Sequence, residues 1–231
     1  MNKIGRQMRA MENFEARIQF GNMEANLRFL EKTQVLQKEF KFLEIGSGTG
    51  GLLHFLLQQG YDIQGVEINP EVIQKSRALY GKLPLFLIDS VLLPFPNEAF
   101  DVVMSFDVFE HIPDSDGHLR EVYRVLKPGG YYLLQTPNKY VNTVFETLRW
   151  KSLRWRKDHC ALHSQKGLLS RFHRHGFEVQ FFRIPVVTEF FKEKVRWYLG
   201  PLGTWLLQIF NPDRWPLVLS PNFYVKATKK Y

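Results

Sequence analysis

From residue 41 onward the chain alternates between short apolar runs and stretches in which apolar residues recur every three or four positions. Short apolar runs bounded by Gly, Pro or Asn predict strands, and the wider spacing predicts helices. The predicted strands are 42–45, 61–68, 85–88, 101–106, 131–135, 177–184 and 223–228. Residues 20–40 have the spacing of an amphipathic helix, with Met23, Leu27, Phe29 and Leu30 on one face. The pattern predicts an α/β fold that follows an N-terminal helix.

Residues typical of helix ends mark the helices between these strands. Gly60 closes the first, and Asn69-Pro70 supplies an N-cap and first position for the second. Pro128-Gly129-Gly130 stops the helix before the fifth strand, and Ser164 and Gly176 bracket a later one. Strands that alternate with helices pair in parallel through right-handed crossovers. We therefore expect a doubly wound sheet.

Length and composition fit one domain with insertions. The chain has 231 residues, 45% apolar and 23% charged, which excludes the disordered and fibrous classes. The lone Cys160 excludes an intramolecular disulfide and any multi-cysteine zinc site. Residues 1–17 contain no apolar stretch typical of a secretory signal, so we expect a reducing, cytoplasmic setting.

Charge is distributed unevenly along the chain. Residues 1–138 hold 14 Lys and Arg against 17 Asp and Glu, whereas residues 139–231 hold 17 against 6. All five tryptophans lie in the basic part. Such a region suits an anionic substrate, a membrane surface or nucleic acid, and it is equally compatible with a solubilising charge bias around core aromatics.

A glycine-rich loop, Gly46 to Gly51, stands between the first predicted strand and the helix that follows it. Glycines there permit positive φ and close approach of a ligand to backbone N–H groups at a helix N-terminus. The spacing is G-x-G-x-G, which differs from the G-x-G-x-x-G expected for a dinucleotide pyrophosphate. The loop alone indicates a ligand site without identifying the ligand.

Acidic residues end the next two predicted strands. Glu67 lies 21 residues after Gly46, where a carboxylate can accept ribose hydroxyls, and Asp89 ends the third strand. In a doubly wound sheet, ligands bind beyond the carboxyl ends of the strands. The loop, Glu67 and Asp89 together predict one site at that edge.

Four motifs now stand in order: LEIGSGTGG, GVEINP, IDSVLLPFPNEAFDVVMSFDVFEHI and VLKPGGYYLLQTPN. They resemble the class I S-adenosylmethionine-dependent methyltransferases, in particular the small-molecule group that includes the ubiquinone-pathway O-methyltransferases. The resemblance covers residues 41–138 and continues more weakly through 158–179. It implies a Rossmann-like sheet of seven strands whose last strand is antiparallel, and S-adenosylmethionine as cofactor. The implied domains are a helical cap at 1–40 and a methyltransferase domain at 41–231.

The resemblance also implies a cofactor site. The strand-one carboxylate and the glycine loop would surround the methionine part, and Glu67 would bind the ribose hydroxyls. The acidic end of the third strand would accept from the adenine amino group, and the end of the fourth would line the methyl-transfer side. The implied cofactor residues are Glu44, Gly46, Ser47, Gly48, Gly50, Glu67, Ile68, Asp89, Ser90, Phe106 and Asp107. Phe95 is expected to hold the loop before the fourth strand.

Three histidines are candidate general bases for a hydroxyl acceptor: His111, His159 and His163. An unperturbed imidazole titrates near neutral pH, and packing or surface roles are alternatives for each. His159 and His163 are spaced to share a helical face, but a third metal ligand is lacking, so no metal site is expected.

The absence of two known motifs reduces the number of possible classes of methyl acceptor. The fourth strand continues as SFDVFEH, without the Asn-Pro-Pro-aromatic box that holds an exocyclic base nitrogen. The only cysteine, Cys160, is not part of a Pro-Cys dipeptide, so covalent attack on a pyrimidine ring is not indicated. Segments 139–163 and 185–221, expected to be irregular, leave the ligand end of the sheet and contain every tryptophan. They predict a lid over an apolar, aromatic or lipid-linked acceptor. Residues 197–210 are too short to span a bilayer and suit its interface.

We therefore expect an S-adenosylmethionine-dependent methyltransferase, with O-methylation favoured, that is cytoplasmic or peripheral to an anionic membrane. The alternatives are an RNA methyltransferase, an NAD(P)-dependent oxidoreductase, and a cofactor-binding protein without catalysis. The acceptor and the oligomeric state are not fixed by the sequence.

Overall fold

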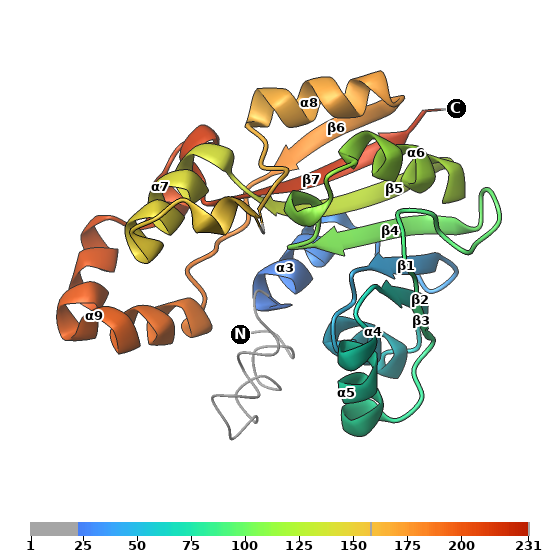
Figure 1. The fold of residues 1–231 in the computed structure, drawn as a ribbon, viewed down its shortest axis with the longest axis horizontal. Coiled ribbons are helices and arrows are strands. Elements are labelled where there is room, and N and C mark those ends of the chain that lie inside the picture. Colours follow the sequence, from blue (N-terminus) through green and yellow to red (C-terminus); the bar gives the residue numbers. More distant parts are fainter. Residues whose placement is uncertain (1–22, 158, 231) are drawn as a thin grey trace.

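A computed structural model describes residues 23–157 and 159–230, and the structural statements below concern these residues. They form one seven-stranded sheet in the order β3-β2-β1-β4-β5-β7-β6 (Figure 1). Neighbouring strands from β3 to β5 pair in parallel, and β7 is antiparallel to both β5 and β6. The predicted sheet with an antiparallel last strand is confirmed. The strands are β1 (Lys41–Ile45), β2 (Asp62–Glu67), β3 (Leu85–Leu87), β4 (Phe100–Phe106), β5 (Leu126–Pro137), β6 (Phe177–Phe182) and β7 (Asn222–Lys229).

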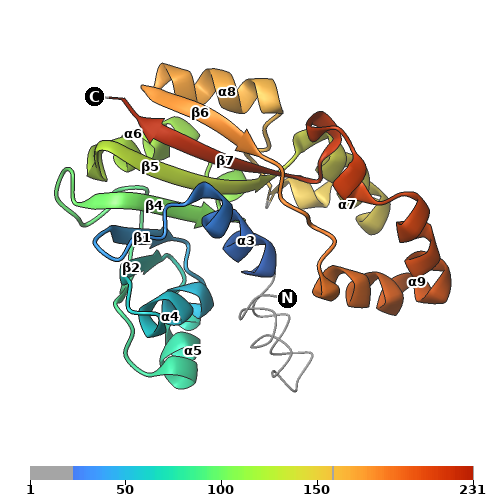
Figure 2. The ribbon, with the colours of Figure 1, turned by 180° about the vertical axis from the view of Figure 1, so that it is seen from behind.

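Helices cover both faces of this sheet, because successive side chains of a strand point to opposite faces. One buried cluster packs α3 and α4 against Phe42 and Met104, and α3 crosses this face in Figure 2. The other cluster packs α6 and α8 against Leu43 and Val103. The helices are α3 (Met23–Thr33), α4 (Gly51–Gln58), α5 (Pro70–Tyr80), α6 (Ser115–Val125) and α8 (Gln165–Arg174).

The helix ends lie where the capping residues predicted them for α5 and α8. The Asn69 side chain accepts from the N–H of Glu71 at 2.9 Å, and the Ser164 hydroxyl accepts from the N–H of Gly167 at 3.1 Å. Gly176 follows α8 with φ of +82°. Phe95 packs edge-on against Phe86 and Phe100, which is the structural role expected of it.

Two boundaries differ from the prediction. The first helix ends at Thr33 rather than near residue 40, and residues 20–22 of its predicted start lie outside the described chain. The helix before the fifth strand ends at Val125, and β5 begins at once at Leu126. Pro128-Gly129-Gly130 therefore lies inside a strand, where the pairing of β4 with β5 shifts register between Phe100 and Val102.

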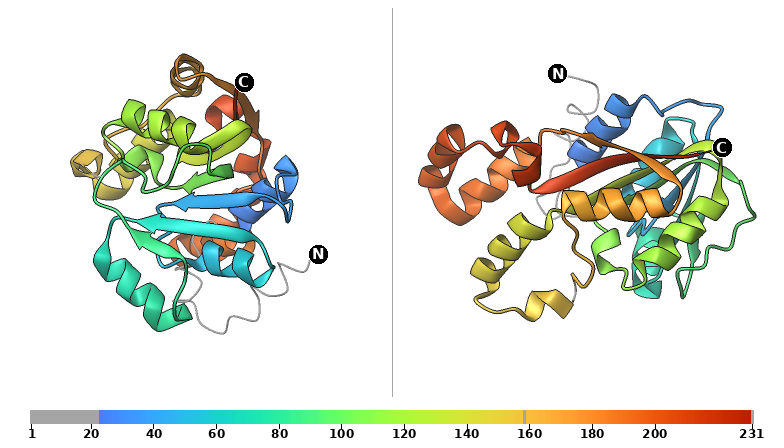
Figure 3. Two further views of the ribbon diagram at one scale, coloured as in Figure 1. Left: turned by 90° about the vertical axis from the view of Figure 1, so that its right-hand side faces the viewer. Right: turned by 90° about the horizontal axis from the view of Figure 1, so that it is seen from above.

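The two late segments are helical, which corrects the expectation that they are irregular. They contain α7 (Lys139–Trp150), η2 (Arg154–Lys157), α9 (Glu189–Ile209), η3 (Pro212–Arg214) and η4 (Leu217–Leu219). The helical periodicity of α7 and α9 is hard to recognise in the sequence because many of their apolar side chains are exposed. In addition, Gly200 (φ 60°, ψ −155°) and Pro201 interrupt α9. Helices α7 and α9 project from the end of the sheet at which β4 terminates, as the topology predicted (Figures 1 and 3). Over the described residues, no helix combines the length and apolarity needed to cross a bilayer.

Asn138 joins these segments to the sheet. This buried side chain caps α7 by accepting from the N–H of Tyr140 at 3.1 Å. Its amide also donates to the carbonyls of Val218 and Ser220 at 2.8 and 2.9 Å. One side chain therefore ties the start of α7 to the chain that leads into β7.

We predict that Asn138→Ala lowers the free energy of unfolding by about 2–4 kcal/mol, because it removes a helix cap and leaves two carbonyls without their donor. Asn69→Ala removes a cap alone and should cost about 1 kcal/mol. Urea titrations of both variants provide the comparison. Equal losses would show that Asn138 serves only as a cap.

Candidate cofactor and acceptor site

The loop after β1 is folded back over the end of β2. The N–H groups of Gly46 and Ser47 both donate to the carbonyl of Val66, at 2.9 and 3.0 Å. Gly46, Gly48 and Gly50 all have positive φ, between +55° and +81°. A Cβ on Gly46 would collide with Val108, whereas one on Gly48 would meet no atom within 4 Å. The loop is thus packed on one side and open at Gly48.

Glu67 holds this loop through its carboxylate. Oε2 accepts from the N–H of Gly48 at 2.9 Å, and Oε1 accepts from the N–H groups of Ile68 and Asn69 at 2.8 and 3.0 Å. A carboxylate offers about four acceptor positions, so one position on Oε2 remains. Glu67 is nearly buried, and its strand is fixed between β1 and β3.

Glu44 is a buried carboxyl at the same edge. It is 6% exposed, and its Oε2 has no hydrogen-bond partner among the residues that the structure describes. Burial raises the pKa of Glu44 to about 8, because the charged form loses its hydration. An orphaned carboxylate oxygen of this kind fits a cationic or hydrogen-donating ligand group.

The ends of β2 and β3 lie side by side. Ile68 is 63% exposed directly after Glu67, and Asp89 and Ser90 are exposed just beyond β3. The Ser90 hydroxyl accepts from the N–H of Leu92 at 3.3 Å. The structure therefore brings these three predicted residues to the same edge as the glycine loop.

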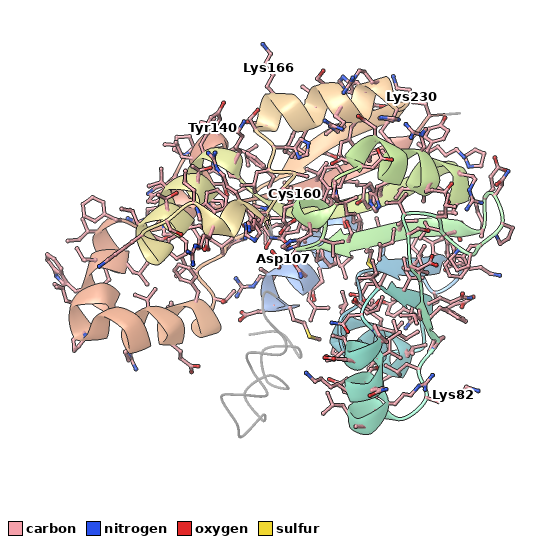
Figure 4. All side chains as sticks on the ribbon, viewed as in Figure 1. Lys82, Asp107, Tyr140, Cys160, Lys166 and Lys230 are labelled. Atoms are coloured by element: carbon pink, nitrogen blue, oxygen red, sulfur yellow. The ribbon has the colours of Figure 1, made fainter. Side chains whose placement is uncertain are left out.

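The end of β4 carries Phe106 and Asp107. Asp107 has φ of +55° and is held by Gln135 of β5: its N–H donates to Gln135 Oε1 at 2.7 Å, and Gln135 Nε2 donates to Asp107 Oδ1 at 2.9 Å. Phe106 packs edge-on against Phe29 of α3. Figure 4 places Asp107 at the end of β4 from which α7 and α9 project. Gln135 was not predicted, because a buried strand residue gives no motif.

Two of the three predicted histidines lie together. The rings of His111, at the end of η1 (Phe109–His111), and His159 are 5.0 Å apart, with an interplanar angle of 70°. Asn142 Nδ2 on α7 lies 3.0 Å from His159 Nδ1, and an amide NH₂ can only donate. In this contact the Asn142 amide donates and His159 Nδ1 accepts.

His163 is separate from this pair. Its ring packs against Phe109 at 5.2 Å, and its backbone carbonyl accepts from the N–H of Lys139. Burial lowers the pKa of His163 to about 4, so the imidazole is neutral and a weak base at neutral pH. Residues 159–163 are not helical, so His159 and His163 do not share the helical face that their spacing allowed.

Glu110 is a further buried carboxyl that sequence reasoning missed. It is 1% exposed and accepts from the Thr136 hydroxyl at 3.0 Å, and its Oε1 lies 4.0 Å from His111 Nε2. Burial, reinforced by the nearby Asp107, raises the pKa of Glu110 to about 8. Its position next to His111 in the chain was the signal that could have identified it.

A glycine loop after β1, a carboxylate after β2 and an antiparallel last strand define the class I S-adenosylmethionine-dependent methyltransferases. The chain belongs to the family of methyltransferase domains, which it matches over residues 15–180. It is similar to a structure from Thermotoga maritima described as an S-adenosylmethionine-dependent methyltransferase, possible histamine N-methyltransferase. The TM-score is 0.62 at 20% identity, covering 94% of this chain and 95% of that one.

Curated relatives match about two fifths of the chain. The ubiquinone biosynthesis O-methyltransferase of Paramagnetospirillum magneticum is 34% identical over 100 residues, which are 42% of this chain and 40% of the relative. The sterol 24-C-methyltransferase of Pneumocystis carinii is 35% identical over 97 residues, which are 39% of this chain and 26% of the relative. The chain thus matches well under half the length of these relatives.

The buried state of Glu44 leads to a stability prediction. Because its pKa in the folded state (about 8) is above the value of 4.5 typical of an unfolded chain, its contribution to stability is fully present below about pH 4.5 and is lost as pH rises toward 8. Glu44→Gln removes this dependence. The difference in unfolding free energy, variant minus wild type, should grow by on the order of 3 kcal/mol between about pH 5 and about pH 8.

Urea titrations of the ligand-free proteins across this range measure that difference. A difference that stays flat with pH would mean that the Glu44 carboxyl is ionised in the folded protein throughout.

Proposed function

We propose that this methyltransferase transfers the methyl group of S-adenosylmethionine to a hydroxyl of a small apolar acceptor, which is aromatic or carried on a lipid. The observation that carries the proposal is the His111–His159 pair, which links the end of β4 to α7. On α7, the apolar side chains of Tyr140, Val144, Phe145 and Leu148 are exposed.

Three features of the loop support cofactor binding beyond β1 and β2. The unpartnered Glu44 oxygen matches the amino group of the methionine part. The remaining acceptor position on Glu67 Oε2 matches one ribose hydroxyl, whereas a second hydroxyl would have to displace a loop N–H. Gly48 leaves open the space that a side chain would fill. The adenine end would meet the exposed residues Ile68, Asp89 and Ser90, with Gly46, Ser47 and Gly50 shaping the loop.

S-Adenosylmethionine supplies a methyl group on a positively charged sulfonium. Transfer is an in-line displacement, so holding the acceptor in line can provide much of the acceleration. The rigid end of β4 suits that task, because the Gln135 contacts fix Asp107 in its positive-φ conformation and Phe106 is packed on α3.

Among the three histidines, the geometry favours His111 as the general base. His163 is a weak base because of its lowered pKa, and the accepting nitrogen of His159 is occupied by Asn142. His111 is partly exposed, with 44% of its side chain accessible, and it ends η1, which follows β4 in the chain. A proton taken up by His111 would face the Glu110 carboxyl. We assign His159 a positioning role, through its edge-on contact with His111.

Relatives support an apolar acceptor without fixing the atom methylated, since their names refer to ubiquinone biosynthesis and to carbon 24 of sterols. RNA methylation is a second candidate, favoured by the exposed basic side chains between α7 and η2. Because the chain belongs to the methyltransferase family, the alternative of an NAD(P)-dependent oxidoreductase is rejected.

A labelling experiment tests the acceptor class. The protein is incubated with S-adenosylmethionine labelled in its methyl group and with a cell extract that contains lipids, small molecules and RNA. We expect label in the organic phase, in a molecule heavier by one methylene. Label confined to RNA would overturn the apolar acceptor.

With the acceptor so found, His111→Ala should lower kcat by roughly 10²–10⁴-fold, because the hydroxyl loses its base. The KM for S-adenosylmethionine should change little, since His111 is not among the proposed cofactor residues. The control is His173→Ala, an exposed histidine on α8. If both variants retain wild-type kcat, His111 is not the base.

A further inference from the structure

Helices α7 and α9 and the chain after α9 expose many large apolar side chains. Leu148 is 73% exposed, Phe210 is 62% exposed, and Trp205 is 54% exposed. Such side chains normally become buried against a partner when they gather on a surface. We call this set the apolar arm; its members are Tyr140, Val144, Phe145 and Leu148 of α7, Leu202, Trp205, Ile209 and Phe210 at the end of α9, and Trp215, Val218 and Leu219 beyond it.

The members follow helical spacing and are connected. Tyr140, Val144 and Leu148 recur every four residues and so lie along one side of α7. Leu202, Trp205 and Ile209 are spaced three and four residues apart, so they lie along one side of the second half of α9, after the break at Gly200. The hydrogen bonds from Asn138 to the carbonyls of Val218 and Ser220 bring the end of this chain segment to the start of α7. Figure 3 shows both helices beyond the same end of the sheet.

The exposed charges around the apolar arm have one sign. In 139–157 and 189–219, every charged side chain that the structure describes as exposed is basic. The described acidic side chains there are Glu146, which is buried, and Glu193 and Asp213, which are half-buried. Asp213 accepts from the N–H of Val186 at 2.7 Å. The exposed basic residues are Lys139, Lys151, Arg154, Arg156, Lys157, Lys192, Arg196 and Arg214.

Opposite sides of α7 serve two environments. Asn142 Nδ2 lies 3.0 Å from His159 Nδ1, so the side of α7 that carries Asn142 faces the proposed acceptor site. Val144 and Leu148 are exposed instead. The helix therefore has a polar contact with the site and an apolar face toward the surroundings.

We propose that the apolar arm and its basic residues form a docking surface for an anionic lipid bilayer. Amphipathic helices with basic flanks bind in the interfacial plane, where apolar side chains enter the acyl boundary and Lys and Arg meet anionic headgroups. Single-stranded RNA would also use basic residues, but it binds by stacking on aromatic rings, whereas six of the eleven arm residues are aliphatic. The inference rests on the proposed function, because the surface would deliver an apolar acceptor from the membrane to His111.

Sedimentation with vesicles tests this surface. The full chain is mixed with vesicles of phosphatidylcholine alone or of equal parts phosphatidylcholine and phosphatidylglycerol. We expect binding to the anionic vesicles that weakens with added salt, and much less binding to the neutral ones. No binding to anionic vesicles at low salt would overturn the proposal.

Paired variants separate the two components. Arg154→Gln with Lys157→Gln should weaken binding to anionic vesicles by roughly 25-fold, since each charge near such a surface is worth about fivefold. Leu148→Ser with Phe210→Ser should weaken it by at least tenfold, because apolar area is lost from the interface. The matched controls lie on α5, away from the arm: Lys75→Gln with Arg77→Gln, and Leu79→Ser, all at exposed positions. If the α5 control variants weaken vesicle binding as much as the variants of the apolar arm and its basic residues do, the binding is non-specific adsorption and the assignment is overturned.

Two further measurements separate failure of docking from failure of the proposed function. Calorimetric binding of S-adenosylhomocysteine without lipid reports the cofactor site alone; if it persists while vesicle binding is absent, only the docking proposal is wrong. Tight binding of a single-stranded RNA oligonucleotide, lost in the Arg154 and Lys157 variant, would assign the basic residues to nucleic acid and overturn membrane docking.

Discussion

The carboxylate of Glu67 is the interaction on which the site depends. By accepting from the N–H groups of Gly48, Ile68 and Asn69, it fixes the loop after β1 against the turn that opens α5. A nearly buried carboxylate with three charge-assisted hydrogen bonds is a strong constraint. The parallel pairing of β1 with β2 sets the distance between the loop after β1 and the turn after β2. The parallel pairing of β1 with β4 places Asp107 on the opposite side of the loop after β1. The proposed cofactor site is therefore built on the loops that follow β1, β2 and β4 of the parallel sheet.

The acceptor half is built differently. The proposed acceptor residues His159, Asn142 and Trp155 belong to segments that project beyond the sheet, and Asn138 ties the start of α7 to the chain that leads into β7. Under the proposed function, the sheet edge would hold the cofactor and the late segments would select the acceptor. The names of the curated relatives refer to different acceptors, which is consistent with such a division.

Much of the fold could be predicted because local signals agreed with tertiary structure. Asn69-Pro70 and Ser164 begin helices where capping chemistry requires, and the alternation of apolar runs and helical periods gave the sheet. The helices α7 and α9 were missed because an exposed apolar face does not produce the usual contrast between core and solvent sides. The start of β5 was missed because Pro128-Gly129-Gly130 is accommodated by a register shift, which sequence alone does not reveal. Gln135 and Asn142 act through contacts between distant segments, which no spacing rule encodes, whereas Glu110 could have been found from its place next to His111.

The central claim is that the loop held by Glu67 is the cofactor cradle, and the pair Gly48 and Gly81 tests it most directly. Both have positive φ, and a Cβ on either would meet no atom within 4 Å, so Gly48→Ala and Gly81→Ala strain the backbone without a clash. Only Gly48 lies in the cradle. Calorimetric titration with S-adenosylhomocysteine should show affinity at least about tenfold weaker for Gly48→Ala, and within about twofold of wild type for Gly81→Ala. Undiminished affinity in a folded Gly48→Ala protein would contradict the account.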